Sequence, residues 1–239
     1  MKYLQEQLET LINNLPDAEI LRQRCDNLVS AHPFNKYEFV ISHLLAANVL
    51  SIDAYSRLRD GYIERNPYSY LFEINAPRTF GENWAQEHLK ELVPELIKPA
   101  KAVDPNYSGE YDFFLDGIRI EVKASRVVDD GVRAPLYVKA LASDSQKGFD
   151  MNFQQIKPAC CDVFVWIAVW RDLIQYWVLS SKEVENNRYY SPKQHLNSVN
   201  EGQFHVTHQN IQSLSIYSVH PHDLLAAIEA AYQRQLASC

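Results

Sequence analysis

Residues 109–126 (GEYDFFLDGIRIEVKASR) combine the pattern of a half-buried strand pair with charged side chains that could do chemistry. The Asp-Gly dipeptide at residues 116–117 is a strong signal for a two-residue hairpin turn, because a type I′ turn needs positive φ at both central positions. A turn of that length places Asp112 directly across from Glu121. Lys123, two residues further along the second strand, lies on the same face, so two acids and an amine share one side of the hairpin.

An opposed pair of carboxylates is a poor way to build a sheet and a reasonable way to hold a cation. Opposed Cβ atoms lie about 5 Å apart, and like charges placed there are destabilising. Lys123 relieves the repulsion in part, and a divalent cation would relieve it better. Mg²⁺ prefers oxygen ligands and is commonly held by one or two carboxylates with waters and phosphate oxygens.

Asp112, Glu121 and Lys123 therefore suit metal-assisted phosphodiester hydrolysis, with the lysine contacting a phosphate or polarising the attacking water. The alternative interpretation is a solvated strand face with incidental charges. The choice depends on the register of the hairpin, since a longer turn would shift the pairs.

Glu82, in GENWAQEHL, is a further candidate. On a helix it is aligned with Ala85 and Leu89, which we expect to face the sheet. A carboxylate on a buried stripe is costly unless it is paired or bound to a metal. The alternative is an acid in the first helical turn, where the helix dipole favours negative charge.

Helices and strands alternate around these residues, from about residue 78 to 185. We expect a helix at TFGENWAQEHLKELVPEL, the hairpin, a strand at APLYVKAL, a short helix around FDMNFQQIKPA, and strands at CDVFVWIAVW and LIQYWVLS. This order predicts a mixed α/β fold, with a central mixed β-sheet flanked by helices.

The flanking segments have different patterns. Apolar residues at helical spacing predict helices up to about residue 66, with Asn35 and Ser51 as candidate N-caps, and a connecting segment follows. FHVTHQNIQSLSIYSV could hold one or two short strands, and HPHDLLAAIEAAYQRQLA predicts a terminal helix. The expected parts are a helical N-terminal region (1–76), a core (77–185) and a C-terminal segment packed on the core (186–239).

Composition limits the class of protein. None of the four cysteines has C-x-x-C spacing, so a structural zinc site is not expected. The net charge of −7 argues against a nucleic-acid partner, but only weakly, because phosphate contacts depend on local clusters and acids can hold a cation. We find no signal-peptide pattern and no long apolar run, and we expect a cytoplasmic protein.

In order and spacing these residues resemble the PD-(D/E)xK nuclease superfamily, over roughly residues 80–180. GENWAQEHL resembles the first helix of the family, GEYD the start of its Asp-bearing strand, and IEVKAS its E-x-K strand. The proline of the family name is absent, since a tyrosine precedes Asp112. The resemblance implies a restriction-endonuclease-like core with Asp112 and Glu121 as metal ligands, Lys123 as the catalytic lysine and Glu82 as an auxiliary acid.

Other residues are weaker candidates. Many family members place a helix with a glutamine near the site, which makes Gln154 or Gln155 possible auxiliary residues. Ser125 could hydrogen-bond a phosphate, although a solvent-facing serine explains it equally well. Four downstream cations could contact the DNA backbone or be merely solvated: Arg126, Arg133, Lys139 and Lys147.

A chain of this size without a nucleotide-binding loop is similar to type II restriction endonucleases, which implies a sequence-specific double-stranded DNA endonuclease using Mg²⁺, with Mn²⁺ as a substitute. It also implies a homodimer, a cognate DNA methyltransferase in the same system that is not a bound subunit, and an N-terminal region that grips DNA or dimerises. The alternatives are a repair or structure-specific nuclease of the same fold, and a non-catalytic DNA- or protein-binding module.

Overall fold

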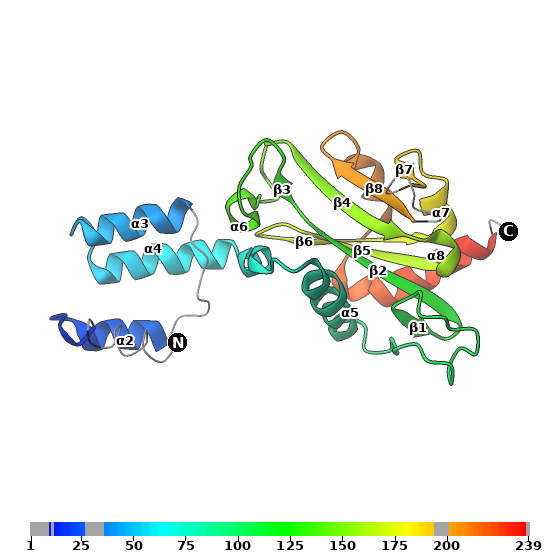
Figure 1. The fold of residues 1–239 in the computed structure, drawn as a ribbon, viewed down its shortest axis with the longest axis horizontal. Helices are drawn as coiled ribbons and strands as arrows, with labels where there is room; N and C mark the ends of the chain where they lie inside the picture. Colours follow the sequence, from blue (N-terminus) through cyan, green and yellow to red (C-terminus); the bar gives the residue numbers. More distant parts are fainter. Residues whose placement is uncertain (1–9, 11, 27–35, 194–200, 238–239) are drawn as a thin grey trace. The chain divides into compact units, whose positions relative to one another are not determined.

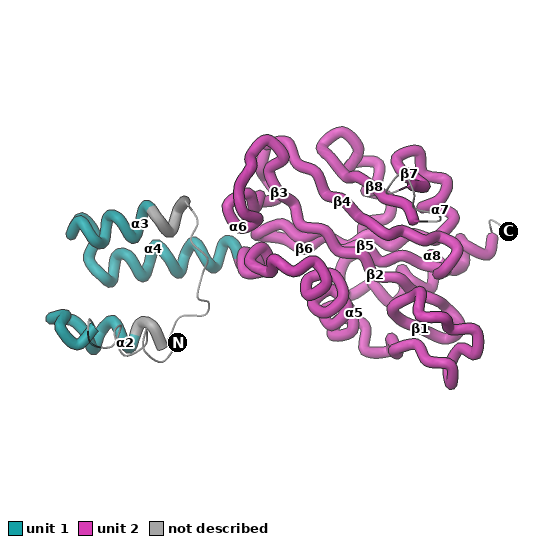
Figure 2. The backbone as a smooth tube through the Cα atoms, viewed as in Figure 1, with its two compact units in different colours: residues 1–66 teal, residues 67–239 magenta. Residues whose placement is uncertain are grey.

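The computed structural model describes residues 10, 12–26, 36–193 and 201–237. The chain divides into two compact units, residues 1–66 and residues 67–239 (Figure 2). The sequence pattern placed the end of the helical region at residue 76, after this division. The difference arises because the segment after the division belongs to the second unit, where a 3₁₀ helix, η1 (Ser69–Glu73), buries Leu71 and Phe72 in its core.

The first unit is helical where it is described, with α2 (Ala18–Asp26), α3 (Lys36–Ala46) and α4 (Ile52–Arg65). Ser51 caps α4, because its hydroxyl accepts a hydrogen bond from the Ala54 backbone N–H at 3.2 Å. The other candidate cap, Asn35, lies outside the described residues.

A five-stranded mixed sheet forms the centre of the second unit, in the order β1-β2-β5-β6-β9 (Figure 1). Its strands are β1 (Phe113–Leu115), β2 (Ile118–Arg126), β5 (Val163–Val169), β6 (Ile174–Ser180) and β9 (Ser218–Val219). The β2–β5 pair is parallel and the other pairs are antiparallel. The strands expected at CDVFVWIAVW and LIQYWVLS are β5 and β6, and the expected mixed α/β architecture is confirmed.

Helices cover one face of this sheet: α5 (Ala85–Leu92), extended at its start by a π-helical segment, η2 (Thr79–Trp84), and α8 (Leu224–Ala237). They share one apolar cluster with alternate residues of β5, which are Val163, Val165, Ile167 and Val169. The intervening residues of β5 belong to a second cluster, so the two clusters lie on opposite faces.

A second, antiparallel sheet covers the other face, in the order β3-β4-β8-β7. Its strands are β3 (Val128–Asp129), β4 (Phe149–Ile156), β8 (Gly202–Thr207) and β7 (Tyr190–Ser191). Trp166 of β5 stacks on Phe153 and meets Phe204 edge-on, with ring centroids 4.9 and 4.8 Å apart.

Two expected elements are wrong. The short helix expected around FDMNFQQIKPA is strand β4, because Phe149, Met151 and Phe153 alternate with polar residues and all three are buried between the sheets. The strand expected at APLYVKAL is a short helix, α6 (Leu136–Lys139), where Val138 N–H donates to the Pro135 carbonyl.

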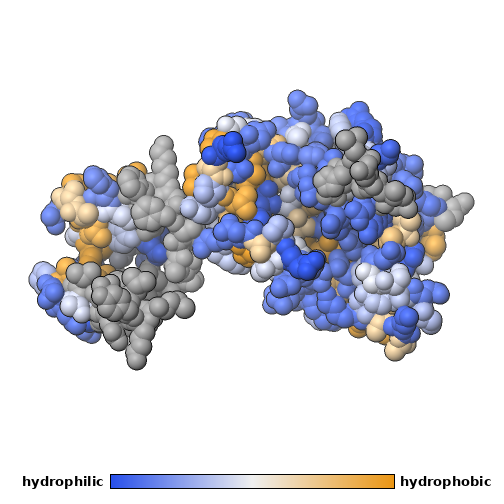
Figure 3. Space-filling view, in the orientation of Figure 1, coloured by the Kyte–Doolittle hydropathy of each residue, from blue (hydrophilic) through white to orange (hydrophobic). Residues whose placement is uncertain are grey.

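Short elements complete the second unit: η3 (Pro158–Cys160), α7 (Ser181–Glu185), η4 (Ile211–Tyr217) and η5 (Pro221–Asp223). Hydrophilic side chains dominate the face of residues 67–239 that Figure 3 shows. Within the described part of the chain, no helix is long and apolar enough to cross a membrane.

Candidate active site

The hairpin has the register that the Asp-Gly turn predicts. Phe113 pairs with Ile120, where the pairing of the two strands ends, and the backbone N–H of Asp112 also donates to the Ile120 carbonyl, at 3.0 Å. The turn residues at 116–117 have φ of 44° and 93°, as a type I′ turn requires. Asp112 lies just before the first paired residue of β1, and its hydrogen bond to the Ile120 carbonyl departs from the direct opposition to Glu121 that the turn predicts.

The two acids and the lysine meet in one cluster. The Glu121 carboxyl is hydrogen-bonded to the Asp112 carboxyl, and Lys123 Nζ lies 2.6 Å from Glu121 Oε1. The side chains of Lys123 and Glu121 are only 17% and 15% exposed. The low exposure shows that this face is not solvated, and burial strengthens the electrostatic interactions within it.

Burial controls the protonation of the acid pair. Loss of water raises the pKa of Glu121 to about 7, against the opposing effect of Lys123. Burial also raises the pKa of Asp112, and the hydrogen bond from Val122 N–H, 2.8 Å from Oδ2, opposes that rise. The pair thus releases its proton at a higher pH than a solvated pair of carboxylates would.

Sequence reasoning missed two residues of this cluster, Gln86 and Lys98. Gln86 Nε2 donates to Asp112 Oδ1 at 2.5 Å, and Gln86 Oε1 accepts a hydrogen bond from Lys98 Nζ. Gln86 lies four residues after Glu82, the acid that the sequence pattern selected in the same helical segment. No local signal identifies either residue, because both reach Asp112 only through tertiary packing.

Glu82, the selected acid, points elsewhere. Its side chain is 60% exposed and pairs with Arg78 at 3.2 Å. The physical reason is the π-helical segment η2, whose wider turns break the α-helical spacing that aligned Glu82 with Ala85 and Leu89. Its surroundings are those of an exposed acid near the helix start.

Ser125 and Arg126 end strand β2, and both are drawn into the protein. Ser125 is buried. The Arg126 guanidinium donates to the carbonyls of Leu71 and Ile74 at 3.0 and 2.5 Å and lies 4.2 Å from the centre of the Phe80 ring. Burial lowers the pKa of Arg126 to about 10. These contacts fasten segment η1 to the sheet and direct Arg126 inward.

The remaining cation candidates lie on the surface beyond the strand. Arg133 is exposed, and Lys139 is half-buried at the end of α6. Lys147 is exposed and pairs with Asp129 at 2.7 Å. The structure shows no contact between these three side chains and the acid pair.

Gln154 and Gln155 lie on strand β4, so the helix that the family resemblance implied for them is absent. Both are exposed, and Gln155 has φ of 54° at a break in the β4–β8 register. This bulge follows the alternating apolar run, and the period-2 pattern of that run could have identified the strand.

The donor set suits a hard divalent cation. Asp112 and Glu121 offer carboxylate oxygens side by side, and the donors that now contact them, from Gln86, Val122 and Lys123, are all electropositive. Across the described ranges, no group of three or more His, Cys, Asp and Glu could hold a metal ion. The chain would thus supply two carboxylates, which is the usual protein share for Mg²⁺, with waters and phosphate oxygens as the other ligands.

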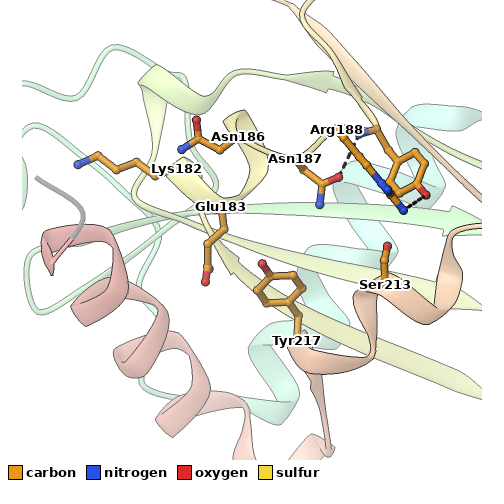
Figure 4. A pocket seen from close by; sticks show the side chains of 8 residues that line it. Lys182, Glu183, Asn186, Asn187, Arg188, Ser213 and Tyr217 are labelled. Carbon is orange, nitrogen blue, oxygen red and sulfur yellow. Dashed lines mark hydrogen bonds between the residues drawn. The ribbon is translucent and has the colours of Figure 1, made fainter.

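A separate pocket, with a volume of about 510 Å³, lies beside α7 and η4 (Figure 4). Its lining includes Lys182, Asn186 and Tyr217. None of the site residues predicted from the sequence lines it, and the acid pair is therefore the better candidate for chemistry.

Comparison with protein-family models and with curated proteins gives no match.

Proposed function

We propose that the protein is a Mg²⁺-dependent endonuclease that hydrolyses phosphodiester bonds in double-stranded DNA. The observation that carries the proposal is the contact between the Asp112 and Glu121 carboxyls at the end of the hairpin, with Lys123 beside them. Burial raises the pKa of Glu121 to about 7, which supports the proposal because the pair favours added positive charge, and a divalent cation would supply it.

Each residue has a distinct role in this proposal. Asp112 and Glu121 would hold the cation, which neutralises phosphate charge and lowers the pKa of a bound water. Lys123 donates at Nζ, so it can orient the attacking water or a phosphate oxygen. The water oxygen bonds to phosphorus as the bond to a sugar oxygen breaks. The water gives up one proton to solvent, and the sugar oxygen takes one up.

The order of helix, Asp-bearing strand and E-x-K strand supports membership in the PD-(D/E)xK superfamily. Within it we propose a sequence-specific type II restriction enzyme, acting as a homodimer because two-fold protein symmetry matches palindromic DNA. A cognate methyltransferase would then protect the host DNA. Mn²⁺ would replace Mg²⁺, since both accept oxygen ligands.

Digestion of a long mixed-sequence DNA tests the proposal. With Mg²⁺, the wild type should produce discrete bands, while Lys123→Ala should lose activity by a factor of roughly 10² or more, as expected for a group acting in the transition state. Cleavage only of branched or damaged DNA would favour a repair or structure-specific nuclease. DNA binding without any cleavage would favour a non-catalytic module and contradict the proposal.

A further inference from the structure

Lys98 occupies a defined position beside the acid pair, although it is exposed. The preceding residue, Ile97, exchanges two backbone hydrogen bonds with Phe114 of the hairpin, at 3.0 and 2.9 Å, which fixes the backbone against β1. The Lys98 ammonium lies 4.3 Å from the centre of the Phe113 ring. Contacts with an aromatic face and with Gln86 therefore hold the charged end of an otherwise mobile side chain.

Gln86 connects Lys98 to the acid pair. Its amide has one orientation that suits both neighbours, with Oε1 accepting from Lys98 and Nε2 donating to Asp112. The reversed amide would set Nε2 against the ammonium and Oε1 against the carboxylate. Lys98, Gln86 and Asp112 thus form a hydrogen-bonded chain from the surface to the centre of the site.

We propose, on the basis of the proposed function, that Lys98 binds a backbone phosphate of the DNA next to the cleaved bond and that Gln86 positions Asp112 for the cation. An ammonium is a compact point charge and a common phosphate ligand. Its place at the edge of the acid pair brings the phosphate close to the carboxylates. The contact carries no sequence information and contributes to binding any duplex.

The phosphate contact is tested by the salt dependence of duplex binding in EDTA, where no metal and no cleavage intervene. For a mixed-sequence duplex followed by fluorescence anisotropy, Lys98→Ala should reduce the slope of log K against log salt by about 0.9, the value for one phosphate contact. Lys98→Arg should keep the wild-type slope. Lys101→Ala, which removes an exposed lysine nearby, is the matched control and should leave the slope unchanged.

The two proposals fail in different ways. If the wild type binds duplex and Lys98→Ala keeps its slope, or if Lys101→Ala lowers the slope equally, the assignment of Lys98 is wrong and the proposed function stands. If the wild type binds no duplex at any salt concentration, both proposals are wrong.

The positioning role of Gln86 is tested by the affinity of the free protein for Mn²⁺ at one fixed pH, measured by electron paramagnetic resonance. Gln86→Ala removes the donor that holds Asp112 Oδ1 in place, so Mn²⁺ affinity should fall. Glu87→Gln, at an exposed acid on the same helix, is the control and should keep the wild-type affinity. An unchanged Mn²⁺ affinity in a folded Gln86→Ala protein would overturn this role.

Discussion

Asp112 and Glu121 keep their carboxyl groups in contact where water has limited access. A native fold tolerates such a pair only if a proton or cation compensates it. Here Lys123 lies beside Glu121, and burial raises the pKa of Glu121 and so favours its protonated form. Gln86 and Val122 satisfy the remaining acceptors of Asp112. The free protein is thus stabilised by groups that a divalent cation would replace in part.

The raised pKa of Glu121 predicts how stability depends on pH. The unfolded chain releases this proton near the ordinary value of 4.5, whereas the folded protein releases it near 7. The contribution to stability is therefore fully present below the unfolded value and is lost as pH rises through about 7. Between about pH 4 and about pH 8, the free energy of unfolding of the wild type should fall relative to that of Glu121→Gln by about 3 kcal/mol.

Urea denaturation at several pH values checks this prediction. Glu87→Gln, at an exposed acid on α5, serves as the control and should follow the wild type. Parallel pH dependence in wild type and Glu121→Gln would show that Glu121 titrates in the folded protein as it does in the unfolded chain.

At the scale of elements, the hairpin β1–β2 sets the distance between the acids, and Arg126 fastens the far end of β2 to segment η1. The hairpin could be predicted from the sequence because turn chemistry and period-2 alternation are local. Gln86 could not, because its partner lies on another element. The position of Glu82 was predicted wrongly because it lies in a π-helical segment. Such a segment is a local feature of the backbone, but the sequence carries no clear signal for it.

Gly117→Ala tests the turn. Gly117 has φ of 93°, which an L side chain rarely adopts, and no atom lies within 4 Å of an added Cβ. The cost is therefore conformational, about 1–2 kcal/mol. Gly81→Ala, where a Cβ also meets nothing within 4 Å and φ is not positive, should cost much less. Equal thermal unfolding midpoints for the two variants would contradict a strained turn.

Arg126→Ala tests whether this residue is structural. The substitution leaves two carbonyls without their donor and removes a cation–π contact, so the free energy of unfolding should fall by about 2–4 kcal/mol. Arg133→Ala, at an exposed position, should change it by less than about 0.5 kcal/mol. A fully stable Arg126→Ala protein with weaker DNA binding would instead support the phosphate contact that sequence reasoning allowed.

At the scale of the whole molecule, both apolar clusters are formed by residues of the second unit. The central sheet has α5 and α8 on one face and the second sheet on the other. Sequence patterns predicted the helical face, since amphipathic helices are recognisable. They allowed a strand where β8 lies but missed its partner β4, because the short alternating run in β4 was taken for a helix.

The composition of the clusters predicts that residues 67–239 fold without residues 1–66. The fragment should unfold cooperatively with the thermal midpoint of the second unit in the full chain, since no cluster residue is removed. If the N-terminal region grips DNA, duplex affinity should fall while cleavage chemistry persists. Circular dichroism and anisotropy measure the two effects, and a fragment without a cooperative transition would contradict the division.

The central claim is that the Asp112–Glu121 pair binds a divalent cation for DNA cleavage. Asp112→Asn keeps the shape of the side chain and removes its charge. Mg²⁺ binding by calorimetry and DNA cleavage are measured together on the same preparations of wild type and variant. The pH is about 8, above the pKa of Glu121. We predict Mg²⁺ binding and cleavage by the wild type and the loss of both in a folded Asp112→Asn protein. Full cleavage by Asp112→Asn, or a wild type that binds no Mg²⁺, would contradict the account.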